Sequence, residues 1–145
     1  RGTLDQLEAL QIAPQRVVFE ITESEAVEDL DYLMELVGWY RQAGFRVAVD
    51  DLGAGYATLN VLHRLRPEYV KIDMALVRDI DRDAYKSTLV AKFLEAAREL
   101  GVLTVAEGIE SPGEAAWFRE QGVDLLQGYL VARPGSPPPR PTWPG

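Results

Sequence analysis

Five short apolar runs divide the 145-residue chain, and an amphipathic stretch separates each run from the next. The runs are rich in β-branched and aromatic residues, which favours strands, and they lie at residues 17–21, 45–49, 69–72, 102–106 and 125–131. Alternation of apolar strands with helices is typical of a parallel sheet that helices cover. The sequence therefore predicts an α/β fold of the order β-α-β-α-β-α-β-α-β.

Helices are predicted in the four intervening stretches. Ser111, Pro112 and Glu114 combine an N-cap serine, a proline at the first helical position and a capping-box glutamate, which indicates a helix start. Thr22 and Glu25 have capping-box spacing ahead of the first helix. The other three helices are predicted from their apolar periodicity at residues 27–40, 58–65 and 84–100.

Composition excludes several kinds of site. The chain has no cysteine and one histidine, His63, which excludes disulfides, thiolate zinc sites, cysteine nucleophiles and multi-histidine metal sites. Fifteen Lys and Arg residues against 23 Asp and Glu residues give a net charge of −8, which argues against DNA or RNA binding. No run reaches the roughly 18 apolar residues of a membrane span, and no signal-peptide core is present, so a cytoplasmic protein is expected.

One domain is expected at residues 1–134. A proline-rich tail follows at residues 135–145 and is predicted to be extended or disordered.

Acidic residues stand at the ends of four successive predicted strands. Because the carboxyl ends of parallel strands share one edge, we expect these side chains to meet there. Each has a structural alternative, since an acidic residue after a strand also caps the next helix. Glu20 and Lys71 lie inside apolar runs, where a charge is costly without a partner, so Lys71 is expected to pair with the acids. The acidic residues are Glu20, Asp50, Asp51, Asp73, Glu107 and Glu110.

Converging carboxylates repel one another unless cations neutralise them. Mg²⁺ and Mn²⁺ prefer such oxygen ligands, and a pair of ions could activate a water and hold a phosphoryl oxygen. An acidic protein can thus act on an anionic phosphodiester, because bound metals invert the local charge.

Two further features remain open between structural and functional roles. Gly53 and Gly55 suit either a turn with positive φ or a close approach of backbone N–H groups to a ligand. His63 lies in a predicted helix beside Leu62 and Leu65, which favours a packed or surface role over metal ligation.

Five motifs, in order along the chain, resemble those of EAL domains, the bacterial cyclic di-GMP phosphodiesterases. They are FEITES at residues 19–24, DDLGAGY at 50–56, KID at 71–73, AEGIE at 106–110 and QGY at 127–129. The resemblance covers about residues 4–134. It implies a (β/α)₈ TIM-type barrel of which this chain holds about the last five βα units, a partial barrel.

The resemblance also implies roles for the strand-end residues. Glu20, Asp50 and Asp51 resemble metal ligands for Mg²⁺ or Mn²⁺, with two ions expected, and Asp73 resembles a rim acid that supports the metal site. Glu107 occupies the position of the proposed general base.

Other matched positions resemble residues that contact substrate or support the site. Lys71 resembles the residue that orients the attacking water or a phosphate oxygen. Gln127, with Gly128 and Tyr129, resembles a guanine-binding segment. Glu23 resembles a glutamate that holds the loop after its strand, a loop linked to dimerisation, and Glu110 resembles a neighbouring support residue.

The implied reaction is metal-assisted hydrolysis of one phosphodiester of cyclic di-GMP to linear pGpG. The implied partners are cyclic di-GMP, a second copy in a homodimer, and an upstream sensory or diguanylate-cyclase domain.

The family's Glu-Ala-Leu motif is absent in its proper context. Residues 8–10 spell it, but they lie just before the Glu20 strand in a stretch that reads as a short helix. The family's early glutamate ligand and its asparagine ligand therefore have no counterpart in this sequence. That departure supports an alternative, an inactive EAL domain that binds cyclic di-GMP or a protein; an enolase-like lyase is disfavoured by the QGY and DDxGxGY motifs.

Five strands cannot close an eight-stranded barrel. Open strand edges attract other chains, so oligomerisation or poor solubility is predicted.

Overall fold

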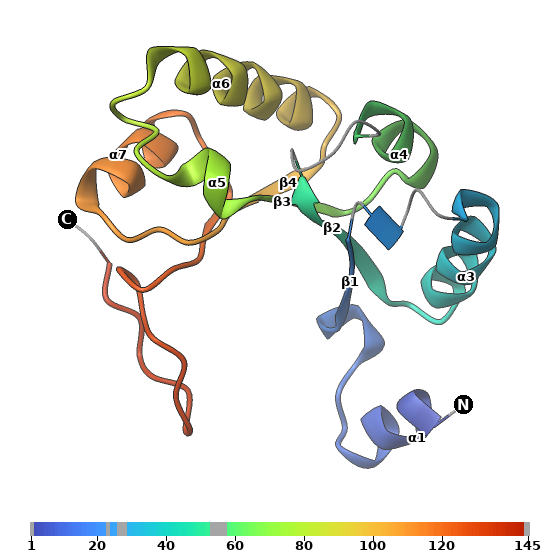
Figure 1. Ribbon diagram of the computed structural model, residues 1–145. Coiled ribbons are helices and arrows are strands. Elements are labelled where there is room, and N and C mark those ends of the chain that lie inside the picture. The colour runs from blue at the N-terminus through green and yellow to red at the C-terminus, as the bar shows by residue number, and fades with distance from the viewer. Residues whose placement is uncertain (1, 23, 26–28, 53–57, 144–145) are drawn as a thin grey trace.

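The computed structural model describes residues 2–22, 24–25, 29–52 and 58–143. Within them, five strands form one parallel sheet in the order β1-β2-β3-β4-β5, so each strand lies beside its neighbour in sequence (Figure 1). The strands are β1 (Val18–Thr22), β2 (Arg46–Leu52), β3 (Tyr69–Ile72), β4 (Leu103–Ala106) and β5 (Leu125–Leu126). Their carboxyl ends share one edge, and the predicted α/β order is confirmed.

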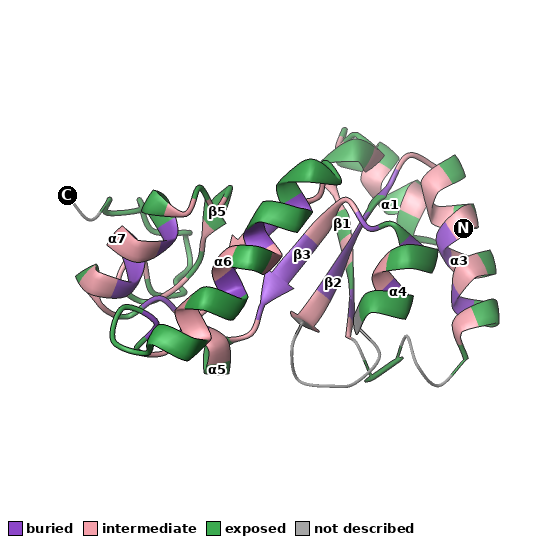
Figure 2. Ribbon diagram, turned by 90° about the horizontal axis from the view of Figure 1, so that it is seen from above, coloured by how far each residue is buried: buried purple, intermediate pink, exposed green. Residues whose placement is uncertain are grey.

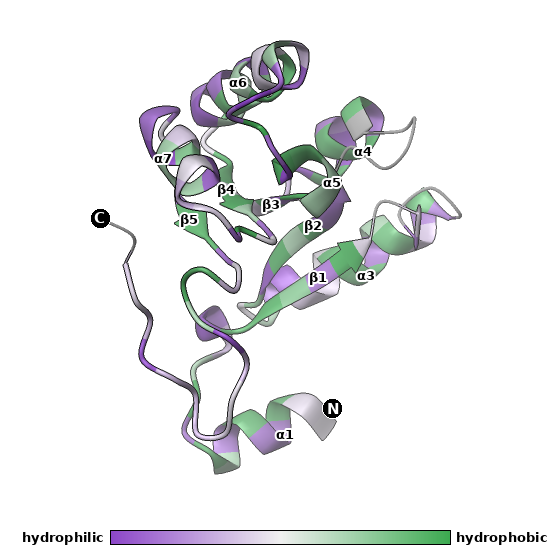
Figure 3. Ribbon diagram, turned by 60° about the vertical axis from the view of Figure 1, so that its left-hand side comes forward, coloured by the Kyte–Doolittle hydropathy of each residue, from purple (hydrophilic) through white to green (hydrophobic). Residues whose placement is uncertain are grey.

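The crossover helices cover one face of this sheet, and buried residues lie along the strands and the inward sides of the helices (Figure 2). One apolar cluster joins β1, β2 and β3 to α3 and α4, and a second joins β3 and β4 to α6 and α7. Figure 3 shows mainly hydrophobic strands and helices in which hydrophobic and hydrophilic residues alternate. The helices are α1 (Gly2–Ala9), the 3₁₀ turn η1 (Pro14–Arg16), α3 (Leu30–Gln42), α4 (Thr58–Leu65), α5 (Met74–Val77), α6 (Ala84–Glu99) and α7 (Pro112–Glu120).

Most helix boundaries follow the predicted signals. The capping box of α7 is present in both directions between Ser111 and Glu114, as predicted. Thr22 and Glu25 form the predicted reciprocal hydrogen bonds, at 2.9 Å from Thr22 N to the Glu25 carboxylate and 3.3 Å in return to Thr22 Oγ1. The helix expected at residues 27–40 is observed as α3, which begins only after Asp29, whose carboxylate accepts from Tyr32 N.

The short helix α5 was not predicted. Asp73 is its N-cap, with the carboxylate accepting from Ala75 N at 2.8 Å. This single turn is too short to show the apolar periodicity that reveals longer helices.

The predicted fifth strand at residues 125–131 is wrong beyond Leu126. After β5 the chain turns over Ile109, whose N–H donates to Gln127 O at 3.0 Å and whose carbonyl accepts from Leu130 N at 3.1 Å. A Cβ at Gly128 would overlap the Ile109 backbone, so this crossing requires glycine. Gln127, Gly128 and Tyr129 therefore lie in a turn and not in a strand.

Each edge strand of the described sheet, β1 and β5, pairs on one side only. On the face away from the helices, Val18, Leu103 and Leu125 are 37%, 40% and 49% exposed. Both features are consistent with self-association, which stays a prediction.

The proline-rich tail contains neither helix nor strand at residues 135–143. Thr142 N donates to Val131 O at 2.8 Å, which ties this segment back to the end of the domain. The domain boundary at residue 134 stays a prediction.

Gly128→Ala should reduce the free energy of unfolding by about 1–3 kcal/mol, because the new methyl group forces the turn away from Ile109. The matched control is Gly38→Ala in α3, where a Cβ meets nothing within 4 Å and alanine should stabilise the helix by roughly 0.5–1 kcal/mol. Urea unfolding of both variants measures this. Equal stability of Gly128→Ala and the wild type would contradict the crossing.

Candidate metal centre

Side-chain alternation directs the strand-end residues onto the face of the sheet opposite the helices. Val49 and Ile72 pack in the helix-facing clusters, so Asp50 and Lys71 beside them point to the other face. Parallel register then aligns neighbouring strands, with Thr22 opposite Asp50 and Lys71 opposite Val105. Charged groups from separate strands consequently meet at one end of the sheet.

Lys71 lies at the centre of this group. Its Nζ is 2.7 Å from Glu107 Oε1, 3.0 Å from Glu20 Oε2 and 3.7 Å from Asp50 Oδ1. The Lys71 side chain is only 8% exposed, whereas Glu20 is 51% exposed at the outer side. The predicted pairing of Lys71 with the rim acids is therefore present.

An irregularity in β2 brings Asp51 to the same place as Asp50. Consecutive strand residues normally point to opposite faces. Here the register between β2 and β3 shifts between Val49 and Leu52, and Asp51 has a φ of 57°. Its N–H donates to Asp50 Oδ1 at 2.8 Å. A left-handed conformation at a non-glycine residue is uncommon and often accompanies a functional constraint.

The residues present fit a hard divalent cation. Asp50, Asp51 and Glu107 each offer a carboxylate oxygen, and these three oxygens lie within 4.8 Å of one another. Oxygen ligands of this kind suit Mg²⁺, Mn²⁺ or Ca²⁺.

The electrostatics of the centre reflect burial and like-charge repulsion. Burial raises the pKa of Glu107, an effect that Lys71 opposes and Asp50 reinforces. Burial also raises the pKa of Asp51, with further contributions from Asp50 and Asp73. For Lys71, burial alone would lower the pKa, but hydrogen bonds to Glu107 and Glu20 outweigh it, and the pKa lies above its usual value.

Two predicted rim acids make other contacts. Asp73 caps α5, which is the structural alternative expected for such a residue, and it is not among the three clustered carboxylates. Glu110 Oε2 is 3.0 Å from Arg78 Nη1. Their support of a metal site stays a prediction.

The segment predicted to bind guanine follows β5 at the same end of the sheet. Tyr129 is 55% exposed, and the Arg133 guanidinium lies over its ring at 4.6 Å from the centroid. Base binding by Gln127, Gly128 and Tyr129 stays a prediction. Glu23 and the glycines at residues 53 and 55 lie outside the described residues.

Sequence reasoning missed a second set of contacts of Glu114. It predicted the capping box, but not that this carboxylate is 1% exposed and also accepts from Asp79 N at 3.1 Å. The motif signals a local cap only, and the contact with Asp79 joins residues 35 positions apart.

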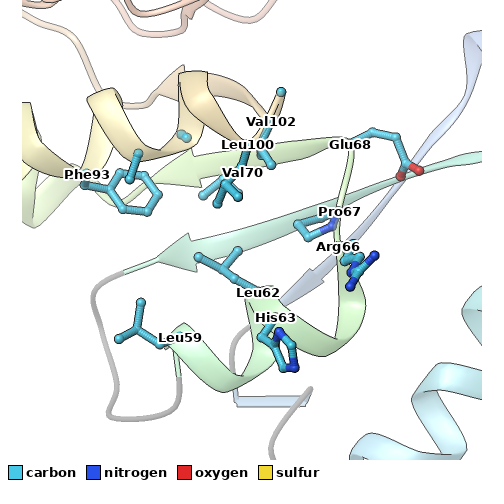
Figure 4. Close-up of a pocket in the computed structure, with 13 residues that line it drawn as sticks. Leu59, Leu62, His63, Arg66, Pro67, Glu68, Val70, Phe93, Leu100 and Val102 are labelled. Carbon is cyan, nitrogen blue, oxygen red and sulfur yellow. The ribbon is translucent and has the colours of Figure 1, made fainter.

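A groove of about 720 Å³ lies between α4 and α6 (Figure 4), and Asp50, Asp51 and Glu107 are not among the residues that line it. Its apolar lining includes Leu62, Val70, Phe93 and Leu100, and His63 lies at its edge. The surface position of His63 agrees with the role expected from the sequence.

Each helix within the described residues is too short or too polar to span a lipid bilayer.

The EAL domain family matches residues 1–134. The chain is 36% identical over 119 residues to the probable cyclic di-GMP phosphodiesterase PdeN of Escherichia coli, covering 82% of this chain and 23% of PdeN. It thus spans about a quarter of that relative's length.

Solved structures agree with the family match. A standalone EAL protein of Vibrio cholerae in its c-di-GMP bound form has a TM-score of 0.89 and 37% identity, covering 97% of this chain and 60% of that one. Klebsiella pneumoniae BlrP1, in a complex with calcium and cyclic di-GMP, has a TM-score of 0.87 and 38% identity, covering 92% of this chain and 34% of that one. These likenesses confirm the predicted part of an EAL TIM-type barrel.

Mn²⁺ should stabilise the fold more at pH 7 than at pH 5. The pKa values of Asp51 and Glu107 are raised, so stability from their protonated forms is present at low pH and lost as pH rises through the folded-state pKa values. A bound cation offsets that loss but competes with protons at pH 5. At a Mn²⁺ concentration about 100 times Kd, the expected gain at pH 7 is about 2.7 kcal/mol, measured by thermal unfolding.

Asp51→Asn should remove most of this gain, and Asp5→Asn on the exposed helix α1 should leave it intact. An equal effect of Mn²⁺ at both pH values, or on Asp51→Asn and the wild type, would contradict the assignment.

Proposed function

The chain belongs to the EAL domain family, and we propose that it hydrolyses cyclic di-GMP to linear pGpG in bacterial second-messenger signalling. The observation that carries the proposal is the acidic centre built around Lys71. It combines three clustered carboxylates with a buried ammonium group at one strand-end rim. Relatives and structural neighbours that act on or bind cyclic di-GMP support the choice of substrate.

The proposed metal ligands are Glu20, Asp50 and Asp51, and the Glu107 carboxylate lies close enough to Asp50 and Asp51 to contact the same ion. The proposed cofactor is a pair of Mg²⁺ or Mn²⁺ ions. Such ions would polarise a phosphodiester oxygen as Lewis acids and would lower the pKa of a water, so that it gives up a proton more readily and becomes a better nucleophile. The manganese complex of BlrP1 supports a divalent cation for this family.

Lys71 orients the reacting groups in this proposal. Its Nζ carries three N–H donors, of which Glu107 and Glu20 accept at 2.7 and 3.0 Å. Because it is fixed between strands and keeps its charge over the physiological pH range, Lys71 can hold a water or a phosphate oxygen at a defined place.

Glu107 is the proposed proton acceptor. Burial raises its pKa, which makes it a stronger base than an exposed glutamate. The Glu107 side chain is 17% exposed, so bulk solvent has limited access to its carboxylate.

Gln127 and Tyr129 are proposed to bind a guanine, the former through its amide and the latter by stacking its exposed ring on the base. For the whole protein we also propose a homodimer and an upstream sensory or diguanylate-cyclase domain. Relatives such as PdeN are much longer than this chain, which leaves room in them for further domains.

Incubation of the chain with cyclic di-GMP and Mn²⁺ should produce pGpG, detected by chromatography. Glu107→Gln should lower the rate by at least about 100-fold, because it removes the proton acceptor without changing the volume of the side chain. Glu99→Gln, at an exposed position of α6, is the matched control and should keep the wild-type rate.

Tight binding of cyclic di-GMP without turnover would instead support the alternative, an inactive EAL domain that acts as a receptor. Absence of both binding and product would overturn both functions.

A further inference from the structure

One buried carboxylate joins the two chain segments that follow β3 and β4. Glu114, in the first turn of α7, is 1% exposed and makes hydrogen bonds to both segments. Its Oε2 accepts from Glu110 N at 2.9 Å and from Ser111 N at 3.1 Å. Its Oε1 accepts from Asp79 N at 3.1 Å, and Arg78 Nη1 lies 3.5 Å away. Each carboxylate oxygen therefore serves a different segment.

The capping box of α7 explains only half of this arrangement. A capping box needs one acceptor that reaches the N-cap N–H, and glutamine fills that position as well as glutamate. The bonds to Asp79 and Arg78 need a second acceptor, which a glutamine cannot offer because its amide nitrogen is a donor. The geometry thus uses both oxygens of an ionised carboxylate.

The neighbours of Glu114 stabilise the ionised form of its carboxyl group. Burial alone would raise its pKa, but the N–H groups of Glu110, Ser111 and Asp79 together with Arg78 outweigh burial, and the pKa lies below its usual value. Movement of either segment away from Glu114 would leave a buried carboxylate oxygen without its hydrogen-bond donors, which is costly in free energy. The carboxylate therefore holds both segments in place.

Both segments begin at the ends of strands that border the acidic centre, β3 with Lys71 and β4 before Glu107. The one after β4 begins at Glu107, and Gly108, with a φ of 65°, lies against the Met74 side chain of the other segment. Arg78 joins the same two segments a second time through Glu110 at 3.0 Å. Glu107 therefore projects from a segment that is fixed within three residues of its own position.

We propose that Glu114 is a positioning residue for the hydrolytic site: it holds the segment that carries Glu107 against the segment that follows Asp73. This role rests on the proposed function, since it gives Glu107 its place beside Lys71 in the reaction. The hydrogen bonds of Glu114 go to none of the proposed metal ligands, and the residue acts through the backbone of Glu110 and Ser111.

Glu114→Gln tests the proposal because it keeps the volume and the capping box but removes the second acceptor. Its kcat for cyclic di-GMP should fall by about 10- to 100-fold with KM unchanged, and its Kd for Mn²⁺ should rise by about 10-fold. The matched control is Glu68→Gln, which weakens a similar carboxylate that accepts from Val47 N and Arg41 at the opposite end of the sheet. Its kcat and Mn²⁺ affinity should match the wild type.

Hydrogen exchange provides a readout that is independent of catalysis. In Glu114→Gln the amides of Asp79, Glu110 and Ser111 should exchange faster than in the wild type, while those of β2 and β3 remain protected. Unchanged exchange at these three amides, or equal losses of kcat and Mn²⁺ affinity in Glu114→Gln and Glu68→Gln, would overturn the proposal.

Arg78→Met is the second variant, for use if Glu114→Gln does not fold. Its side chain is 37% exposed, so the change spares the core while it removes the charged link to Glu110 and Glu114. Its kcat should fall in the same direction, and a wild-type kcat would contradict the proposal. If the wild type forms no pGpG, the proposed function fails, and the exchange and Mn²⁺ measurements still decide the role of Glu114.

Discussion

The buried ammonium group of Lys71 is the interaction on which the site depends. Its Nζ lies within 3.7 Å of carboxylates from three different strand ends, those of Glu20, Asp50 and Glu107. Without a cation among them, these acids would repel one another in a partly buried space, and their ionised forms would destabilise the fold. Lys71 in turn is 8% exposed and would be costly to bury without such partners. The ion pairs therefore offset the free-energy cost of burying both the ammonium group and the carboxylates.

The sheet brings these groups together through simple geometry. Parallel register aligns the strand ends, alternation turns Asp50 and Lys71 to the face away from the helices, and the irregularity at Asp51 adds a consecutive carboxylate to the same place. Lys71 supplies one positive charge to a group of acids that retains net negative charge. The centre therefore suits a divalent cation.

The sequence was most informative where the signal is local. Strand–helix alternation predicted a parallel sheet covered by helices. The positions of the acidic residues at the strand ends predicted that they would gather with Lys71 at one edge, because the carboxyl ends of parallel strands lie at the same edge. Asp73 shows the limit of this reasoning, since the position alone does not distinguish a metal-supporting acid from the N-cap it forms for α5.

Features that depend on distant contacts could not be predicted in the same way. Gln127, Gly128 and Tyr129 read as part of an apolar run, but the chain leaves the sheet there because Gly128 crosses the Ile109 backbone. The second set of hydrogen bonds of Glu114 likewise depends on where Asp79 lies after folding.

The free energy of unfolding of Lys71→Met at pH 7, with and without Mn²⁺, tests the central role of this residue most directly. Without Mn²⁺, the variant should be about 3 kcal/mol less stable than the wild type, because three carboxylates lose their cation. Mn²⁺ should return the variant most of the way to the stability of the metal-free wild type. Lys92→Met, at a side chain that is 75% exposed, is the control and should change stability by less than about 0.5 kcal/mol. A Lys71→Met variant as stable as the wild type without Mn²⁺ would contradict the account.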